Sequence, residues 1–137
     1  MKLSSNSICP CGSGNKYKKC CQPYHKGIFP KTALQLMRSR YCAFSIKNYR
    51  YIIKTTHSEN QDFTNNIEKW QQDILEFCNS SDFRGLEILE FLDGVDESFV
   101  TFKANIYCKN KNNSFIEKSK FLKVNNIWLY HRGIFIK

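Results

Sequence analysis

The sequence has no aspartate or glutamate before Glu59, although it contains twelve acidic residues in all. Its first 58 residues carry eleven lysines and arginines, whereas the remainder carries ten basic and twelve acidic residues. All of the excess positive charge therefore lies in the N-terminal part. This asymmetry favours an acidic partner, whether a protein surface, a nucleic acid or a phosphorylated ligand, although a basic segment can also serve solubility alone.

Long apolar segments are missing as well. No apolar run has the roughly 20 residues that a membrane-spanning helix needs. The segment from Met1 to Ile8 is polar and lacks the apolar stretch of a secretory signal. There is no internal repeat and no low-complexity segment. With 42% hydrophobic and 15% aromatic residues, the sequence predicts a folded cytoplasmic protein with one ordinary core.

Disulfide pairing cannot account for the cysteines, because there are seven of them and an odd number cannot all pair within one chain. Four follow the spacing C-x-C-x8-C-C, which in a reducing compartment suits a metal better than disulfides. These are Cys9, Cys11, Cys20 and Cys21. The other three lie on apolar segments and are predicted to be buried small hydrophobes: Cys42, Cys78 and Cys108.

Four thiolates are the ligand set that one tetrahedral zinc ion requires. Gly12 and Gly14 allow the chain to fold back between the two cysteine pairs, and a short helical turn could present Cys20 and Cys21. His25 is a substitute ligand in principle, and the alternative is a set of ordinary reduced thiols. A shell filled by four protein ligands leaves no position for water, so we expect a structural Zn²⁺, with iron as the other metal that suits four thiolates.

Helical patterns occupy the middle of the sequence. Thr32 and Gln35 fit a capping box, followed by an apolar stripe that extends to Ile46. A shorter apolar pattern runs from 49 to 53, and a further amphipathic helix is predicted over 64–78. The members of the first stripe are Leu34, Met37, Tyr41 and Phe44.

The second half of the sequence changes to the alternation of strands. Strands are predicted over 86–92, 100–108, 115–122 and 127–136, the last interrupted near Gly133. Asn125-Asn126 suits a two-residue hairpin turn. Helices followed by an antiparallel meander predict an α+β fold with the helices packed on one face of the sheet.

Two motifs carry a resemblance to known families. The run C-P-C-G-S-G-x-K-Y-K-K-C-C, from Cys9 to Cys21, resembles the SEC-C motif, the zinc-binding module of the SecA translocase ATPase. The helix Leu36–Phe44 and the ending Phe115-x-Glu117-x-Ser119-x-Phe121 with Trp128-x-Tyr130-x-x-Gly133 resemble the YchJ-like family. This resemblance implies the same four zinc ligands and an NTF2-like cone. The implied domains are a zinc knuckle with a flexible leader and connector over 1–27 and the NTF2-like domain over 28–137.

One charged pair outside the knuckle is singled out by strand and helix periodicity. Arg38 lies at the margin of the apolar stripe, and Glu117 shares the inward face of its strand with Phe115 and Phe121. Because an unpaired buried charge is costly, we expect an Arg38–Glu117 ion pair. The pair is either purely structural or the polar floor of a ligand pocket that includes Tyr41 and His57. His57 has no carboxylate or nucleophile at a diagnostic spacing, so no catalytic residue is assigned.

The preferred hypothesis is a binding or adaptor protein rather than an enzyme. Its basic zinc-bearing segment would dock on an acidic protein or a ribonucleoprotein, through Lys16, Lys18, Lys19 and Lys26. The alternative is an enzyme or carrier for a small molecule in the NTF2-like cone. A deep polar pocket would favour this alternative, and a filled cone the docking protein. Direct RNA binding by the basic segment is a third possibility, expected to weaken steeply with salt.

Overall fold

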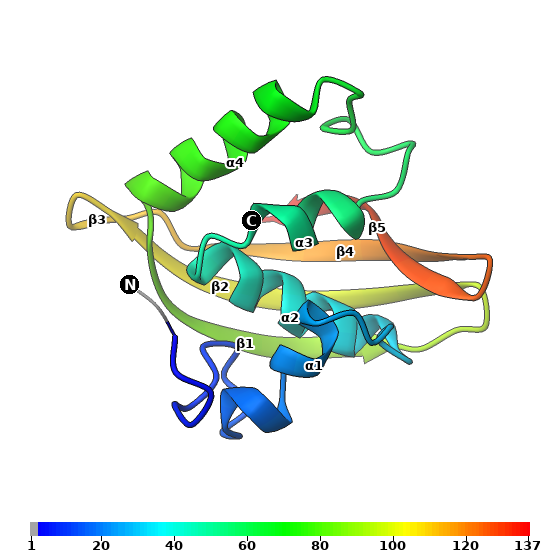
Figure 1. Ribbon diagram of the computed structural model, residues 1–137, viewed down its shortest axis with the longest axis horizontal. Coiled ribbons are helices and arrows are strands. Elements are labelled where there is room, and N and C mark those ends of the chain that lie inside the picture. The colour runs from blue at the N-terminus through cyan, green and yellow to red at the C-terminus, as the bar shows by residue number, and fades with distance from the viewer. Residues whose placement is uncertain (1–2) are drawn as a thin grey trace.

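The computed structural model describes residues 3–137, which form helices followed by an antiparallel sheet (Figure 1). The prediction of an α+β fold is confirmed. In chain order the helices are the 3₁₀ helix η1 (Tyr17–Lys19), α1 (Gln22–His25), α2 (Ala33–Ser45), α3 (Tyr49–Lys54) and α4 (Ile67–Ser80). The strands are β1 (Asp82–Leu92), β2 (Glu97–Cys108), β3 (Lys111–Asn112), β4 (Phe115–Val124) and β5 (Ile127–Ile136).

The long strands lie in the order β1-β2-β4-β5, and the short β3 pairs with β2. Strand β2 alternates as predicted, with four apolar side chains buried on one face: Val100, Phe102, Ala104 and Ile106. Asn125 and Asn126 both have positive φ, 50° and 68°, as a two-residue hairpin turn requires. The register of β4 against β5 shifts so that His131 is left unpaired between Tyr130 and Arg132. The interruption in the last strand is therefore a β-bulge at His131.

Helix α2 crosses the sheet and contacts β1, β2 and β5 (Figure 1). Its start is the predicted one, because the Thr32 hydroxyl accepts a hydrogen bond from the Gln35 amide at 3.1 Å. The Gln35 side chain accepts from the Lys31 amide instead of the Thr32 amide. Burial covers much more of α2 than one stripe, and includes Ser39, Arg40 and Cys42. A second structure must therefore cover the face of α2 that is turned away from the sheet.

The N-terminal segment is that second structure. Ile8 pairs with Lys16 in an antiparallel bridge, and the Tyr17 and Lys18 amides donate to the Ser7 and Ser5 carbonyls. Within the expected flexible leader, the segment 5–8 is therefore hydrogen-bonded to residues 16–18, and Met1 and Lys2 lie outside the described residues. The expected connector at 22–27 contains helix α1. The boundary at residues 27 and 28 stays a prediction.

Helix α4 lies apart from the sheet at the edge of the molecule and contacts α2 and α3 (Figure 1). Asn66 caps its first turn by accepting from the Lys69 amide at 3.2 Å. Trp70 and Ile74 are buried, whereas Phe77 is 42% exposed. No helix in residues 3–137 is long and apolar enough to cross a membrane.

Candidate metal centre and cavity

Cys9 and Cys11 lie on a tight hairpin closed by the Ile8–Lys16 bridge, and Cys20 and Cys21 follow η1, just after this bridge. We call residues 8–21 as a whole the cysteine hairpin. The Cys9 amide donates to the Asn15 carbonyl at 2.8 Å, and Gly12 and Gly14 have φ of 80° and 85°. A Cβ atom on Gly12 would lie 2.7 Å from the Leu86 carbonyl oxygen of β1. Glycine at position 12 therefore permits both the turn and the close packing of the hairpin on the sheet.

The four sulfur atoms converge on one point. The Sγ atoms of Cys9, Cys11, Cys20 and Cys21 all lie within 4.8 Å of one another. The Sγ atoms of Cys11 and Cys20 are 3.4 Å apart, and those of Cys20 and Cys21 are 3.9 Å apart. Tetrahedral zinc with Zn–S bonds of about 2.3 Å separates its sulfur ligands by about 3.8 Å. The residues present fit a zinc ion held by four thiolates.

The surroundings of the cluster act on the pKa values of its thiols in opposite directions. The Ser13 hydroxyl lies 3.1 Å from the Cys20 Sγ, and Arg38 Nη1 donates to the Cys11 carbonyl at 2.8 Å. Hydrogen bonds from neighbouring thiols, Cys11 first, lower the pKa of Cys9, whereas burial raises the pKa of Cys20 to about 11. A buried cluster of this kind cannot carry four thiolates without a cation, and a bound dication would supply that charge.

A fifth thiol touches the cluster from α2. Cys42 is fully buried, and its Sγ lies 3.8 Å from the Sγ of Cys9. Cys42 was expected to be an ordinary buried hydrophobe, and its burial is confirmed. Its position beside a cluster 33 residues earlier in the sequence depends on the packing of α2 against the hairpin. The sequence spacing gave no signal for it.

His25 joins the hairpin to α2 and is not free to bind a metal. Its Nε2 lies 2.8 Å from the Ser39 carbonyl, and its Nδ1 lies 2.6 Å from the Tyr17 hydroxyl. Because a carbonyl only accepts, Nε2 carries the proton and Nδ1 accepts from Tyr17. Burial lowers the pKa of His25, which favours this neutral form. His25 therefore acts as a structural link, and the alternative of a substitute ligand is wrong.

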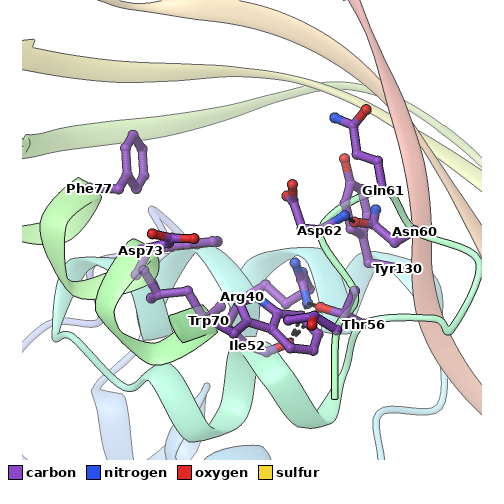
Figure 2. Close-up of a pocket in the computed structure, with 13 residues that line it drawn as sticks. Arg40, Ile52, Thr56, Asn60, Gln61, Asp62, Trp70, Asp73, Phe77 and Tyr130 are labelled. Carbon is purple, nitrogen blue, oxygen red and sulfur yellow. Dashed lines mark hydrogen bonds between the residues drawn. The ribbon is translucent and has the colours of Figure 1, made fainter. Parts of the chain in front are cut away.

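A half-open cavity of about 460 Å³ lies between α2, α3, α4 and the loop before α4, with Tyr130 of β5 in its wall (Figure 2). A second cavity of about 210 Å³ lies between α2 and the sheet. The two share five lining residues: Arg40, Phe44, Asp62, Phe77 and Tyr130. The cone therefore retains space beside α2 that can admit a small ligand, and this space is compatible with a docking role for the separate N-terminal surface.

Arg40 is the charged residue at the base of these cavities. It is 7% exposed, and its Nη1 donates to the Thr55 hydroxyl at 2.7 Å and to the Thr56 hydroxyl at 3.2 Å. Both threonine hydroxyls donate onward to carbonyls of α3, so they are oriented as acceptors for arginine. The guanidinium also lies 4.6 Å from the centre of the Tyr130 ring. Burial lowers the pKa of Arg40, but an arginine remains charged under such conditions.

Glu117 lies on the sheet side of Tyr130. Its Oε2 accepts from the Tyr130 hydroxyl at 3.0 Å and from the Ser119 hydroxyl. Burial and the neighbouring carboxylate raise the pKa of Tyr130, so the phenol stays a neutral donor. A Cβ atom on Gly133 would overlap the Glu117 carboxyl group. Gly133 thus leaves the space that the Glu117 side chain occupies.

Two histidines and a glutamate form a separate cluster beside the β5 bulge. Their candidate ligand atoms, from His57, Glu59 and His131, lie within 4.8 Å of one another. However, His57 Nδ1 accepts from the Glu59 amide, and His131 Nε2 lies 2.9 Å from Glu59 Oε1. Binding of a metal through the other nitrogen of His57 would require a proton on Nδ1, where the amide already donates. The cluster is better explained as a hydrogen-bonded brace of the bulge.

Comparisons with known proteins find relatives for both the cysteine-rich N-terminal segment and the helix-and-sheet part that follows it. A family model described as YchJ, middle NTF2-like domain, matches residues 32–133, and a SEC-C motif model matches residues 6–23. A UPF0225 protein from Sodalis glossinidius is 38% identical over 93% of this chain and 82% of its own length. One from Shewanella sp. strain MR-4 is 37% identical over 96% of this chain and 82% of its own length.

The chain belongs to the YchJ-like UPF0225 family. The solution structure of a SEC-C motif-containing protein from Rhodopseudomonas palustris matches with a TM-score of 0.84 at 28% identity, covering 96% of this chain and 100% of that one. The crystal structure of one from Psychrobacter arcticus matches with a TM-score of 0.80 at 29% identity, covering 93% of this chain and 82% of that one. The expected NTF2-like fold with a SEC-C motif is confirmed.

The expected Arg38–Glu117 ion pair is wrong. Arg38 points to the SEC-C hairpin, where it contacts Cys11, while Glu117 bonds to Tyr130 and Ser119 on the sheet. The error arose because α2 was assumed to have one covered face, and the hairpin covers a second. The arginine on the sheet side of α2 is Arg40, two positions further along the helix.

Of the other expected pocket residues, Tyr41 and Glu117 line the smaller cavity. The Tyr41 hydroxyl donates to the Gly85 carbonyl at 2.9 Å and accepts from the Gly85 amide at 3.0 Å. His57 lies in the bulge cluster instead. Sequence reasoning missed Arg40 and Asp62 as cavity residues. The signal available in the sequence was the pair Thr55-Thr56 at the end of the next helix, because its hydroxyls can accept hydrogen bonds from a buried arginine such as Arg40.

Proposed function

We propose that this family member is a zinc-stabilised docking protein whose basic N-terminal part binds an acidic protein segment. Four converging sulfur atoms support a structural zinc ion, because they would fill all four positions of a tetrahedral ion. Iron would fit the same ligands. None of the seven cysteines, all within residues 3–137, forms a disulfide, and a zinc ion held by four thiolates suits a reducing compartment such as the cytoplasm.

The basic side chains of the N-terminal part are available to a partner. Those proposed for docking are all exposed: Lys16, Lys18, Lys19 and Lys26. Within residues 3–137, none of the four forms an ion pair. Exposed, unpaired lysines attract an acidic partner and accelerate its association.

An apolar groove lined by the 24–30 segment, which includes Lys26 and follows the other three lysines in the sequence, and by Lys54 carries the proposal. A groove of about 320 Å³ runs between the 24–30 segment, α3 and the β4–β5 hairpin. Ile28 and Phe29 at its edge are 61% and 51% exposed. The Lys54 Nζ lies 5.5 Å from the Phe29 ring centre, and the Lys123 Nζ lies 4.9 Å from that of Trp128.

Apolar side chains flanked by Lys54 and Lys123 suit a peptide that combines acidic and apolar residues. A nucleic acid would need base-stacking platforms, whereas Trp128 is buried and its Nε1 donates to the Lys31 carbonyl at 3.2 Å. Charge complementarity and exposed apolar area together therefore favour an acidic protein segment over RNA.

The proposal is tested with a labelled peptide of mixed glutamate and leucine, a polyglutamate peptide of equal length and a single-stranded RNA. We expect the mixed peptide to bind most tightly, and Phe29→Ser and Lys54→Glu each to weaken its binding by about tenfold. The matched controls are Phe135→Ser and Lys111→Glu, which change exposed residues elsewhere. Tighter binding of RNA, or equal effects of the controls, would overturn the proposal.

A further inference from the structure

Two charged side chains at the cavity lack a partner of opposite charge. Arg40 has no carboxylate within ion-pairing distance among residues 3–137, although it is almost fully buried. The carboxylate of Asp62 borders both cavities and has neither a hydrogen bond nor an ion pair within the same residues. By contrast, Asp73 pairs with Lys69, and Glu117 accepts from two hydroxyls. The cavity therefore presents one free positive and one free negative group.

Arg40 retains donors for a ligand. Its three protein hydrogen bonds all come from Nη1, and Nε and Nη2 make none within the described part of the chain. A guanidinium has five N–H groups, and its planar fork matches a carboxylate. Arg40 lines both cavities, so a ligand in either one can reach it. A buried cation that has no direct ion pair gains from an anionic group placed against it.

Four aromatic side chains line the larger cavity, together with polar side chains of the loop before α4. The rings of Phe44 and Phe77 pack edge to face, with their centres 5.7 Å apart. Trp70 and Tyr130 line the larger cavity with them. Figure 2 shows Asp62 and Tyr130 on one side of Arg40, with Asp73 and Phe77 across the cavity on α4. Its volume of about 460 Å³ falls in the range of small-molecule sites, roughly 300–1,000 Å³. Aromatic walls suit an apolar or aromatic ligand body.

We propose that the cavity binds a small zwitterion with an apolar body, of which an aromatic amino acid is the simplest example. Its carboxylate would contact Arg40 and its ammonium group would lie toward Asp62. A simple anion would leave Asp62 repelling it, and a simple amine would leave Arg40 unpaired. Only a ligand with both charges compensates both groups. This site is distinct from the zinc cluster and from the docking groove.

Three matched probes test the proposal by calorimetric titration of the zinc-loaded full chain. L-Phenylalanine has both charges, 3-phenylpropionate has only the carboxylate, and 2-phenylethylamine has only the ammonium group. We expect L-phenylalanine to bind at least about tenfold more tightly than either single-charge probe. Equal affinities, a preference for a single-charge probe, or no binding of any probe at millimolar concentration would overturn the proposal.

Two variants locate the charges without relying on the buried arginine alone. Asp62→Asn changes an exposed side chain and should remove the preference for L-phenylalanine over 3-phenylpropionate. Asp96→Asn, in the exposed β1–β2 turn, is the matched control and should change nothing. Arg40→Lys keeps the charge but loses the fork, and should weaken both carboxylate probes while leaving the amine unaffected. An unchanged preference in Asp62→Asn would overturn the assignment of the ammonium site.

Discussion

Arg38 and Arg40 are two positions apart on α2, yet they lie in opposite environments. Arg38 faces the cysteine hairpin, where it donates to a backbone carbonyl beside the proposed metal. Arg40 faces the cone, where neutral hydroxyls and an aromatic ring surround it and part of its donor capacity is free. The hairpin side of α2 is thus closed by protein groups, whereas the cone side has an unsatisfied charge beside a cavity. We infer that α2 supports structure on one face and ligand binding on the other.

The largest expected effect is loss of the metal. Cys20→Ser/Cys21→Ser removes two of four ligands, and structural zinc sites contribute about 10 kcal/mol or more in isolated modules. Because the hairpin covers one face of α2, we expect loss of bound zinc, a lower melting temperature and faster amide exchange in α2. Cys108→Ser, on a half-buried thiol outside the cluster, is the control. Unchanged metal content in the double variant would contradict the site.

Alanine substitutions at Gly12 and Gly133 should differ in their cost to the free energy of unfolding, because Gly12 packs against backbone and Gly133 against a side chain. Gly12→Ala adds a Cβ against the Leu86 carbonyl at positive φ, so we expect a loss of about 2–4 kcal/mol. Gly133→Ala overlaps the Glu117 side chain, which can rotate, so we expect only about 1–2 kcal/mol. Urea denaturation measures both. A double-mutant cycle with Glu117→Ala should show coupling at Gly133 and none at Gly12, and additivity at Gly133 would refute the explanation.

Replacing each arginine by methionine tests the two faces of α2 directly. Arg40→Met leaves three oxygen acceptors without their donor and should cost about 1–3 kcal/mol without changing zinc retention. Arg38→Met loses one hydrogen bond and should cost about 1 kcal/mol, but it should weaken metal binding by about tenfold. Competition with a zinc chelator and urea denaturation measure the two effects. The comparison fails if Arg40→Met releases zinc as readily as Arg38→Met.

Local sequence signals were sufficient for the longer helices and strands and for the grouping of the four cysteines. The Thr32 cap, the alternation of β2 and the Asn125-Asn126 turn are each decided by neighbouring residues. The placement of Arg38 failed because helical periodicity shows which residues share a face, but not how many faces are covered. The position of Cys42 beside Cys9 and the charge left at Asp62 depend on contacts between distant segments. No residue spacing in one sequence encodes such contacts.

The smallest expected effect concerns Cys42, which tests whether α2 contributes a ligand to the metal site. Its sulfur lies 3.8 Å from that of Cys9, close enough to be a rival ligand as well as a packed neighbour. A tetrahedral ion is filled by the four hairpin cysteines, so Cys42→Ala should keep one zinc per chain. The lost packing around a fully buried side chain should cost about 1 kcal/mol, measured by urea denaturation. Loss of zinc from Cys42→Ala would instead show that α2 supplies a metal ligand. The hairpin face of α2 would then bind metal itself, and the division into a supporting face and a ligand-binding face would be wrong.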